Sequence, residues 1–131
     1  MDGTFSTAPR IFHQLYIIRA PVGESAVTCI YAFLSCKTQE IYEELLHAVV
    51  DACERVAGFS PDPSSVIVDF EQAVMKAIPR VLGEHVSARG CFYHLMQSTW
   101  RKVQELGLSL DYKKNKDIKL FCVMRPSIST A

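Results

Sequence analysis

A short apolar run between two helical patterns constrains the fold of this chain more than any other feature. Val66-Ile67-Val68 is followed at once by Asp69. This pattern predicts a short buried strand that carries a carboxylate at its C-terminal end. The segments around it give the order β-β-α-β-α-β-α, which is typical of an α/β domain. The chain has 131 residues, enough for one domain with a modest core.

The N-terminal part of the chain predicts an antiparallel hairpin. Residues 11–19 and 26–34 are rich in β-branched and aromatic side chains, which favour strands. Pro21 and Gly23 mark the connection, which we expect to be a longer loop. Both strands are nearly continuously apolar in places, so we expect them to be covered on both faces.

Two helices are predicted on either side of the central strand. Thr38 can cap a helix that runs to about Ala57, since its apolar residues fall on one face and Gly58 is a natural stop. A second helix is expected from about Glu71 to Leu82. Pro79 lies inside the second pattern and should kink or split that helix.

The rest of the chain predicts one more strand and helix. Residues 86–92 are a candidate strand, and a helix is expected from about Leu95 to Leu106. We expect residues 1–122 to form a single domain. The polar segment 123–131 is expected to be a disordered tail.

Composition describes an ordinary globular protein with an uneven charge distribution. The formal net charge is 0, but residues 1–100 carry 7 Lys and Arg against 11 Asp and Glu, and residues 101–131 carry 7 against 3. The basic end could contact a phosphate backbone or could be an ordinary solvated surface. We expect an intracellular protein, because no signal peptide or membrane span is visible and the five cysteines fit reduced core thiols.

Two aspartates are candidates for a metal site. Asp2 lies in Asp2-Gly3-Thr4-Phe5 and Asp69 ends the central strand. If their strands are parallel neighbours, both carboxylates meet at the carboxyl edge of the sheet, where α/β sheets bind ligands. Paired carboxylates of this kind hold divalent metal for phosphoryl transfer. Alternatively, Asp2 is a polar terminus and Asp69 a helix cap, while Glu71 is more readily a bystander than a ligand.

Gly90-Cys91-Phe92-Tyr93-His94 is the third motif of interest. The spacing of Cys91 and His94 could bind zinc, but no second ligand pair stands at a suitable distance. A thiol nucleophile at Cys91 would need an orienting acid that is not apparent. A polar contact of His94 near the carboxylate edge is the interpretation we favour. For Trp100, packing of the indole is favoured over stacking on a nucleic-acid base.

Several of these stretches together resemble the central domain of Mutator-like element (MULE) transposases, over residues 2 to about 121. The stretches that carry the resemblance are Asp2-Gly3-Thr4-Phe5, Phe12-His13-Gln14-Leu15-Tyr16, Tyr31-Ala32-Phe33-Leu34 with Lys37-Thr38, Asp69-Phe70-Glu71, Gly90-Cys91-Phe92-Tyr93-His94 and Trp100 to Leu108.

The resemblance implies a fold, a chemistry and a set of site residues. It implies a ribonuclease H-like mixed sheet flanked by helices, with an Asp-Asp-Glu triad that holds Mg²⁺ or Mn²⁺. Asp2 and Asp69 would be the first two acids, both catalytic and metal-binding. Cys91 and His94 match a family signature with a structural or DNA-contacting role. The implied partner is DNA at transposon ends, and the implied location is nuclear, with no membrane association.

The chain also departs from the family pattern. The first strand of the family lies mostly upstream of Asp2, and no residue of the chain matches the third acid. We therefore expect a fragment of a DDE-type DNA transposase core with incomplete first strand and C-terminal part. Since a two-metal site would lack one carboxylate, we expect catalysis by this chain alone to be severely impaired. Self-association through unpaired sheet edges is expected as well.

Two other functions are considered. The chain could be a catalytically inactive domesticated remnant that acts as a DNA- or protein-binding regulator. Asp2-Gly3-Thr4 also resembles part of the nucleophile motif of haloacid-dehalogenase phosphatases. Those enzymes need a nucleophilic aspartate two residues earlier, where this chain has none.

Overall fold

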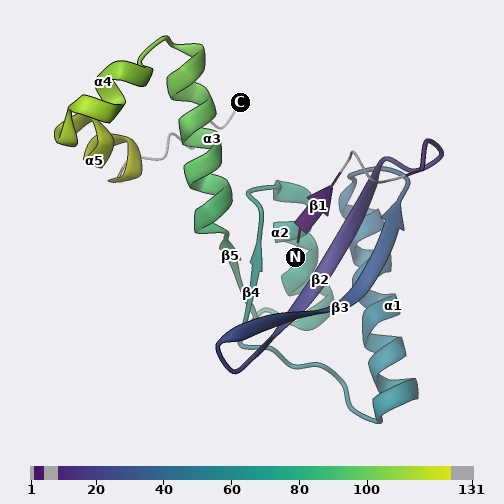
Figure 1. Cartoon of the computed structure of the whole chain (residues 1–131). Coiled ribbons are helices and arrows are strands. Elements are labelled where there is room, and N and C mark those ends of the chain that lie inside the picture. Colours follow the sequence, from purple (N-terminus) through teal and green to yellow (C-terminus); the bar gives the residue numbers. More distant parts are fainter. Residues whose placement is uncertain (1, 5–8, 125–131) are drawn as a thin grey trace. The chain divides into compact units, whose positions relative to one another are not determined.

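The protein has a mixed α/β fold that divides into two compact units, residues 1–89 and 90–131 (Figure 1). The computed structural model describes residues 2–4 and 9–124, with the side chains of residues 9–120. The first unit contains β1 (Asp2–Thr4), β2 (Gln14–Val22), β3 (Ser25–Leu34), α1 (Gln39–Ala57), β4 (Ser65–Val68), α2 (Gln72–Leu82) and most of β5 (Ser87–Gly90). The second contains α3 (Phe92–Glu105), α4 (Ser109–Lys114) and α5 (Lys116–Met124).

The predicted hairpin is present, but its turn is shorter than expected. β2 and β3 pair antiparallel, and the register runs up to Val22 opposite Ser25. Only Gly23 and Glu24 therefore connect the strands, so the expected longer loop is wrong. Gly23 has a positive φ of 61°, a conformation that two-residue hairpin turns require and that glycine adopts without steric cost.

The described strands form two small sheets, one with the order β1-β2-β3 and one with β4-β5. The Ser87 N–H donates to the Ser64 carbonyl over 3.0 Å, so β4 and β5 start side by side, as in a β-α-β unit with α2 as its crossover. A single mixed sheet was expected, and these strands do not form it. β1 is only three residues long, and it pairs antiparallel with β2.

Helix α1 forms where the sequence predicts it. The Thr38 Oγ1 accepts a hydrogen bond from the Ile41 N–H over 3.4 Å, which caps the helix N-terminus. At the other end Gly58 takes the left-handed conformation with φ 70°, and its N–H bonds the Glu54 carbonyl. Residues at the two ends of α1 therefore determine where the helix begins and ends.

Pro79 does not split helix α2, so that part of the expectation is wrong, while the expected kink stays a prediction. The helix runs unbroken from Gln72 to Leu82, and the Pro79 carbonyl still accepts from the Gly83 N–H over 3.1 Å. A proline lacks the N–H that would bond the residue four positions earlier. The burial of Val74 and Ile78 on the same helix provides apolar contacts that offset this loss.

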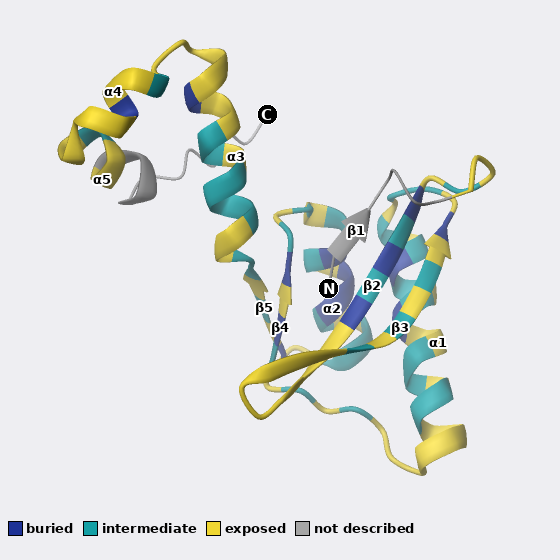
Figure 2. Cartoon of the chain, in the orientation of Figure 1, coloured by how far each residue is buried: buried dark blue, intermediate teal, exposed yellow. Residues whose placement is uncertain are grey.

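The core of the first unit lies between one face of the hairpin and the two helices α1 and α2 (Figures 1 and 2). Alternate residues of β2 point into it, and Tyr16 is fully buried there with Tyr42 of α1. The opposite face of β3 is open, with Tyr31 67% and Phe33 47% exposed. The expectation that both faces are covered is therefore wrong. The buried apolar residues are Tyr16, Ile18, Leu34, Tyr42, Leu46, Val66, Val68, Val74, Ala77, Ile78 and Val86.

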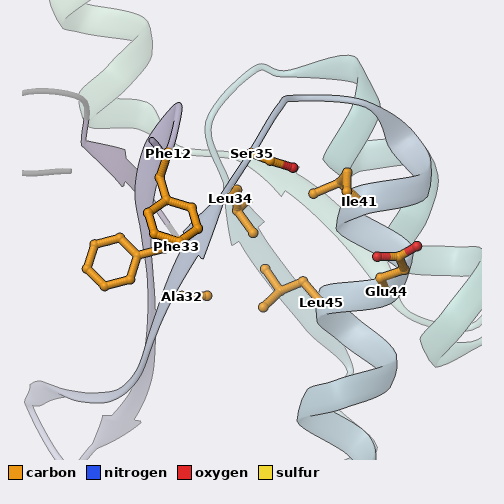
Figure 3. A pocket seen from close by; sticks show the side chains of 8 residues that line it. All are labelled: Phe12, Ala32, Phe33, Leu34, Ser35, Ile41, Glu44 and Leu45. Carbon is orange, nitrogen blue, oxygen red and sulfur yellow. The ribbon is translucent and has the colours of Figure 1, made fainter. Parts of the chain in front are cut away.

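A shallow hollow of about 340 Å³ lies beside the end of β3 and the first turns of α1 (Figure 3). Ile41 and Leu45 line it from the helix, while Phe12 and Phe33 line it from the hairpin side. These two phenylalanine rings stack with their centroids 5.1 Å apart. The hollow is apolar apart from Ser35 and Glu44, and its lining includes none of the site residues that the sequence predicts.

The second unit consists of helices with an aromatic contact at its centre. Trp100 of α3 packs against the buried Tyr112 of α4 with ring centroids 5.5 Å apart, and the Lys113 Nζ lies 5.8 Å from the indole. The packing interpretation of Trp100 is confirmed. Helix α3 begins at Phe92 instead of Leu95, and α5 extends to Met124. The rest of the expected disordered tail, residues 125–131, lies outside the described residues.

The described cysteines and helices bear on two further expectations. Cys29, Cys36, Cys53 and Cys91 are free thiols. Cys29 is exposed, however, so the description of a core thiol is wrong for it; the side chain of Cys122 lies outside the described residues. Across residues 9–124, none of the helices has the length and apolarity needed to cross a bilayer.

The outer edge of β3 generates a prediction about self-association. β3 is the last strand of its sheet, and its ten residues include no charged side chain. Uncharged edges pair readily with other strands. We expect the mass of the protein in sedimentation experiments to rise with concentration, and Tyr31→Lys to suppress that rise. His47→Lys, on the exposed side of α1, is the control, and equal self-association of both variants would contradict the prediction.

Candidate functional site

The turn between β4 and α2 carries Asp69 at the position that the sequence predicts. β4 ends at Val68 and α2 begins at Gln72, so Asp69 directly follows the strand. The buried Val66 and Val68 anchor the strand in the core. The Asp69 side chain is partly buried, with its Oδ1 atom inaccessible to solvent. Asp69 is therefore held at a strand end with one of its two carboxylate oxygens shielded from solvent.

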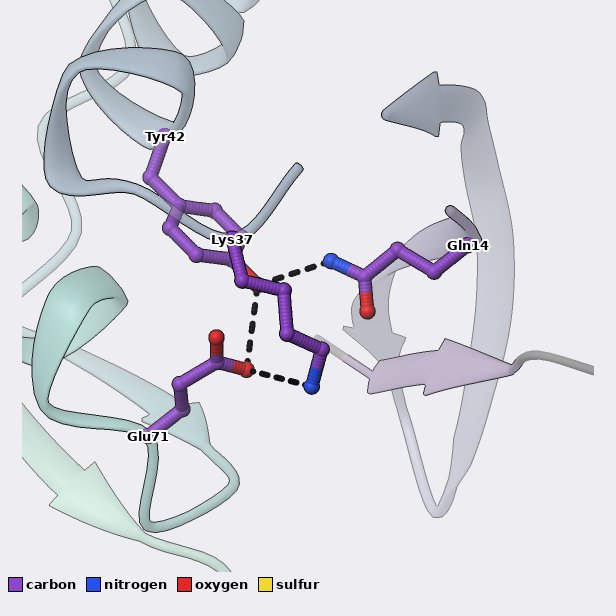
Figure 4. Close-up of polar contacts among 4 residues, drawn as sticks. All are labelled: Gln14, Lys37, Tyr42 and Glu71. Atoms are coloured by element: carbon purple, nitrogen blue, oxygen red, sulfur yellow. Dashed lines mark hydrogen bonds and ion pairs between the residues drawn. The ribbon is translucent and has the colours of Figure 1, made fainter. Parts of the chain in front are cut away.

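A chain of hydrogen bonds links this turn to two other elements of the first unit (Figure 4). The Gln14 Nε2 of β2 donates to the Tyr42 hydroxyl over 2.8 Å, and that hydroxyl donates to the Glu71 Oε2 over 3.1 Å. Gln14 and Tyr42 are fully buried. The Lys37 Nζ, from the segment before α1, lies 3.2 Å from the same Glu71 oxygen. The Glu71 Oε2 atom therefore contacts both a hydroxyl and an ammonium group.

The direction of these hydrogen bonds depends on the Tyr42 hydroxyl keeping its proton. Burial raises the pKa of Tyr42 well above its usual value of about 10, partly opposed by the Gln14 hydrogen bond. The negative charges of Glu71 and Asp69 raise this pKa further. The hydroxyl is therefore a hydrogen-bond donor throughout the physiological pH range. The negative charges of both carboxylates of the turn act on it.

Glu71 makes two side-chain contacts that the sequence did not suggest, while its expected place as a bystander and not a metal ligand stays a prediction. It occupies the position before α2 with extended backbone (φ −79°, ψ 116°), and its side chain does not cap the helix. The carboxylate instead turns to Tyr42 and Lys37, with only 18% of the side chain exposed. Glu71 therefore bonds to side chains of α1 and of the segment before it, and not to its own helix.

The first predicted acid, Asp2, lies in β1, and its side chain is outside the described residues. The β1 backbone pairs antiparallel with β2, with Asp2 opposite Ile17. Since β1 and β4 belong to different sheets in the described part of the chain, the expected parallel pairing between them is not found there. The meeting of Asp2 and Asp69 stays a prediction.

Cys91 and His94 lie in the second unit, at the start of α3. Cys91 precedes the helix and makes no side-chain capping bond. The His94 ring lies edge-on to Tyr93 with centroids 5.8 Å apart, and its Nδ1 is inaccessible to solvent. Within residues 9–120, no three His, Cys, Asp or Glu side chains are grouped to hold a metal ion. The described residues therefore give no support to a zinc site here.

Sequence reasoning missed the partners of Glu71. Gln14 is the one buried polar residue in the described core, and a buried amide must find hydrogen-bond partners. A glutamine inside an apolar strand was a usable signal for this reason. Nothing in the sequence could identify Tyr42 as its partner, since 28 residues separate them.

The polar chain predicts the effect of removing one hydroxyl. Tyr42→Phe keeps the ring but deprives the buried Gln14 amide and the Glu71 carboxylate of a hydrogen bond. We expect the free energy of unfolding to fall by about 1–3 kcal/mol, measured by urea denaturation at pH 7. Tyr31→Phe is the matched control at an exposed tyrosine and should change stability little. Equal effects of the two variants would argue against the network.

The raised pKa of Tyr42 predicts an alkaline loss of stability. The stabilisation by the protonated hydroxyl is fully present below the pKa of about 10 that tyrosine has in the unfolded chain. Above that pH the unfolded state loses its proton while the folded state keeps it, so stability falls as pH rises. The stability difference between the wild type and Tyr42→Phe should therefore shrink above pH ~10. A constant difference from pH 8 to 11, by urea denaturation, would contradict this.

Comparison with known proteins identifies the family. No curated protein and no solved structure matches the chain. The sequence does match the family model of the MULE transposase domain over residues 1–98. The matched region includes every strand of both sheets, the β4–α2 turn with Asp69, and the residues of the polar network. The chain belongs to the MULE transposase domain family.

Proposed function

We propose that this chain carries part of a DDE-type DNA transposase core with a ribonuclease H-like fold. Asp69 and Asp2 are its first two acids, and Mg²⁺ or Mn²⁺ is the metal. The observation that carries the proposal is the placement of Asp69 in a domain of the MULE transposase family. It stands directly after β4, at the start of the β4–α2 turn.

The architecture of the first unit supports this function. The first unit has an antiparallel hairpin followed by a helix and a β-α-β unit, which agrees with the element order expected from the sequence. Ligands of α/β sheets bind beyond the carboxyl ends of the strands, where Asp69 lies. When bound there, divalent metal ions would activate water or a DNA 3′-hydroxyl for in-line attack on a phosphodiester.

The described residues supply part of the ligand set for such a metal. Asp69 offers a carboxylate, the kind of ligand that Mg²⁺ and Mn²⁺ prefer. The neighbouring carboxylate of Glu71 already forms an ion pair with Lys37 and accepts a hydrogen bond from Tyr42. At least one further carboxylate is needed, and Asp2 of β1 is the candidate.

DNA is the proposed partner, and the second unit offers groups that could contact it. The lysines of α4 and α5 are exposed at positions 113, 114, 116 and 119. Lysine side chains of this kind bind phosphate oxygens without reading sequence. We propose a nuclear location together with this partner.

The metal assignment predicts the outcome of a single substitution. Asp69→Asn removes one charge without changing the side chain's size. We expect it to weaken Mn²⁺ binding by roughly tenfold or more, measured by electron paramagnetic resonance of free Mn²⁺. Asp51→Asn on the exposed side of α1 is the control and should bind as the wild type does. Unchanged affinity in Asp69→Asn would show that the site assignment is wrong.

A DNA assay separates the transposase core from the binding regulator considered as the alternative. Metal-dependent nicking of duplex DNA that Asp69→Asn abolishes would support a catalytic core. DNA binding that neither needs metal nor leads to nicking would favour the regulator.

A further inference from the structure

The strongest unexplained feature of the first unit is a chain of polar contacts that links three elements and ends on one oxygen of Glu71. β2 contributes Gln14, α1 and the segment before it contribute Tyr42 and Lys37, and the turn contributes Glu71 itself. Glu71 is two residues from Asp69, and the two share the short turn between β4 and α2. An interaction that fixes Glu71 therefore restrains the backbone that carries Asp69.

We propose that Glu71 is a positioning residue that ties the β4–α2 turn to β2 and α1 and thereby holds the Asp69 carboxylate in place. Gln14, Tyr42 and Lys37 are the other members of this tether. The inference rests on the proposed function for its metal, but the restraint on the turn itself does not.

The geometry favours a tether over a metal ligand for Glu71. Its Oε2 already has a hydroxyl at 3.1 Å and an ammonium at 3.2 Å (Figure 4). A divalent cation bound to the same oxygen would lie close to the positive charge of Lys37 and would be repelled by it. A carboxylate that already has a cationic partner is better suited to hold a backbone turn than to bind a second cation.

Two residues of the tether are also held firmly in the core. Gln14 and Tyr42 are buried, and the ring of Tyr42 packs at 5.3 Å from the ring of Tyr16 in the core. The Tyr42 hydroxyl both accepts from Gln14 and donates to Glu71, so its orientation is fixed by two partners. Residues that orient metal ligands in this way commonly change metal affinity by 10–100-fold when they are replaced.

The test uses the whole 131-residue chain and three variants of the tether. Tyr42→Phe removes the hydroxyl, Glu71→Met removes the carboxylate, and Lys37→Met removes the ammonium at a partly exposed position where misfolding is least expected. Glu43→Gln is the matched control, because it breaks the Arg80–Glu43 ion pair between α1 and α2 without touching the turn.

The first measurement needs no metal. Amide hydrogen exchange is followed at residues 69–73 in the wild type and all variants. We expect exchange there to be roughly tenfold faster in the three tether variants and unchanged in Glu43→Gln. If the tether variants exchange no faster at these residues than Glu43→Gln does, the turn is not held by Glu71 and the inference is overturned.

The second measurement is Mn²⁺ affinity. Positioning predicts that Tyr42→Phe and Glu71→Met each weaken binding by roughly tenfold. The double variant should be little weaker than either single one, because both remove the same link. A Glu71 ligand would instead make Glu71→Met as severe as Asp69→Asn and leave Tyr42→Phe unchanged, which would overturn the positioning role. If the wild type binds no Mn²⁺, the proposed metal site fails, and the exchange measurement still decides the tether.

Discussion

The hydrogen bonds of the Tyr42 hydroxyl fix the positions of β2, α1 and the β4–α2 turn in the first unit. A glutamine inside an apolar core costs free energy unless its amide is hydrogen-bonded, and Tyr42 is the partner that Gln14 finds. This requirement fixes α1 against β2, and the onward bond to Glu71 fixes the β4–α2 turn against α1. Apolar packing alone tolerates small sliding of helices and strands, whereas a directed hydrogen-bond chain defines one register.

The same network explains how distant stretches of the sequence come to act together. Gln14, Lys37 and Glu71 lie in three of the separate stretches that carry the family resemblance. The fold places Lys37 directly on the Glu71 carboxylate and links Gln14 to it through the Tyr42 hydroxyl. The hairpin contributes only one of its faces to this core. Its other face and the edge of β3 remain apolar and exposed, so the hairpin alone does not complete a two-sided sheet.

Local rules were sufficient to predict most elements from the sequence. The cap at Thr38 and the stop at Gly58 define α1, and Val66 to Val68 with Asp69 define β4 and the carboxylate that follows it. Errors arose where a tertiary effect outweighed the local signal. Pro79 suggested a break, but α2 remains intact with its apolar face buried. The apolar character of β3 suggested burial on both sides, because a strand's sequence does not reveal whether a second layer is present.

The candidate site was predictable only in part, and the reason lies in its two carboxylates. Asp69 could be found because a strand end is a local feature, whereas the role of Glu71 depends on partners that come from residues 14, 37 and 42. Two carboxylates on one short turn would repel each other if both faced the same low-dielectric space. Pairing Glu71 with Lys37 and Tyr42 places an ammonium and a hydroxyl donor beside one of the two carboxylates, which lowers that repulsion. Glu71 thus contributes contacts that hold the turn in place, and the role of Asp69 as a cation ligand stays a prediction.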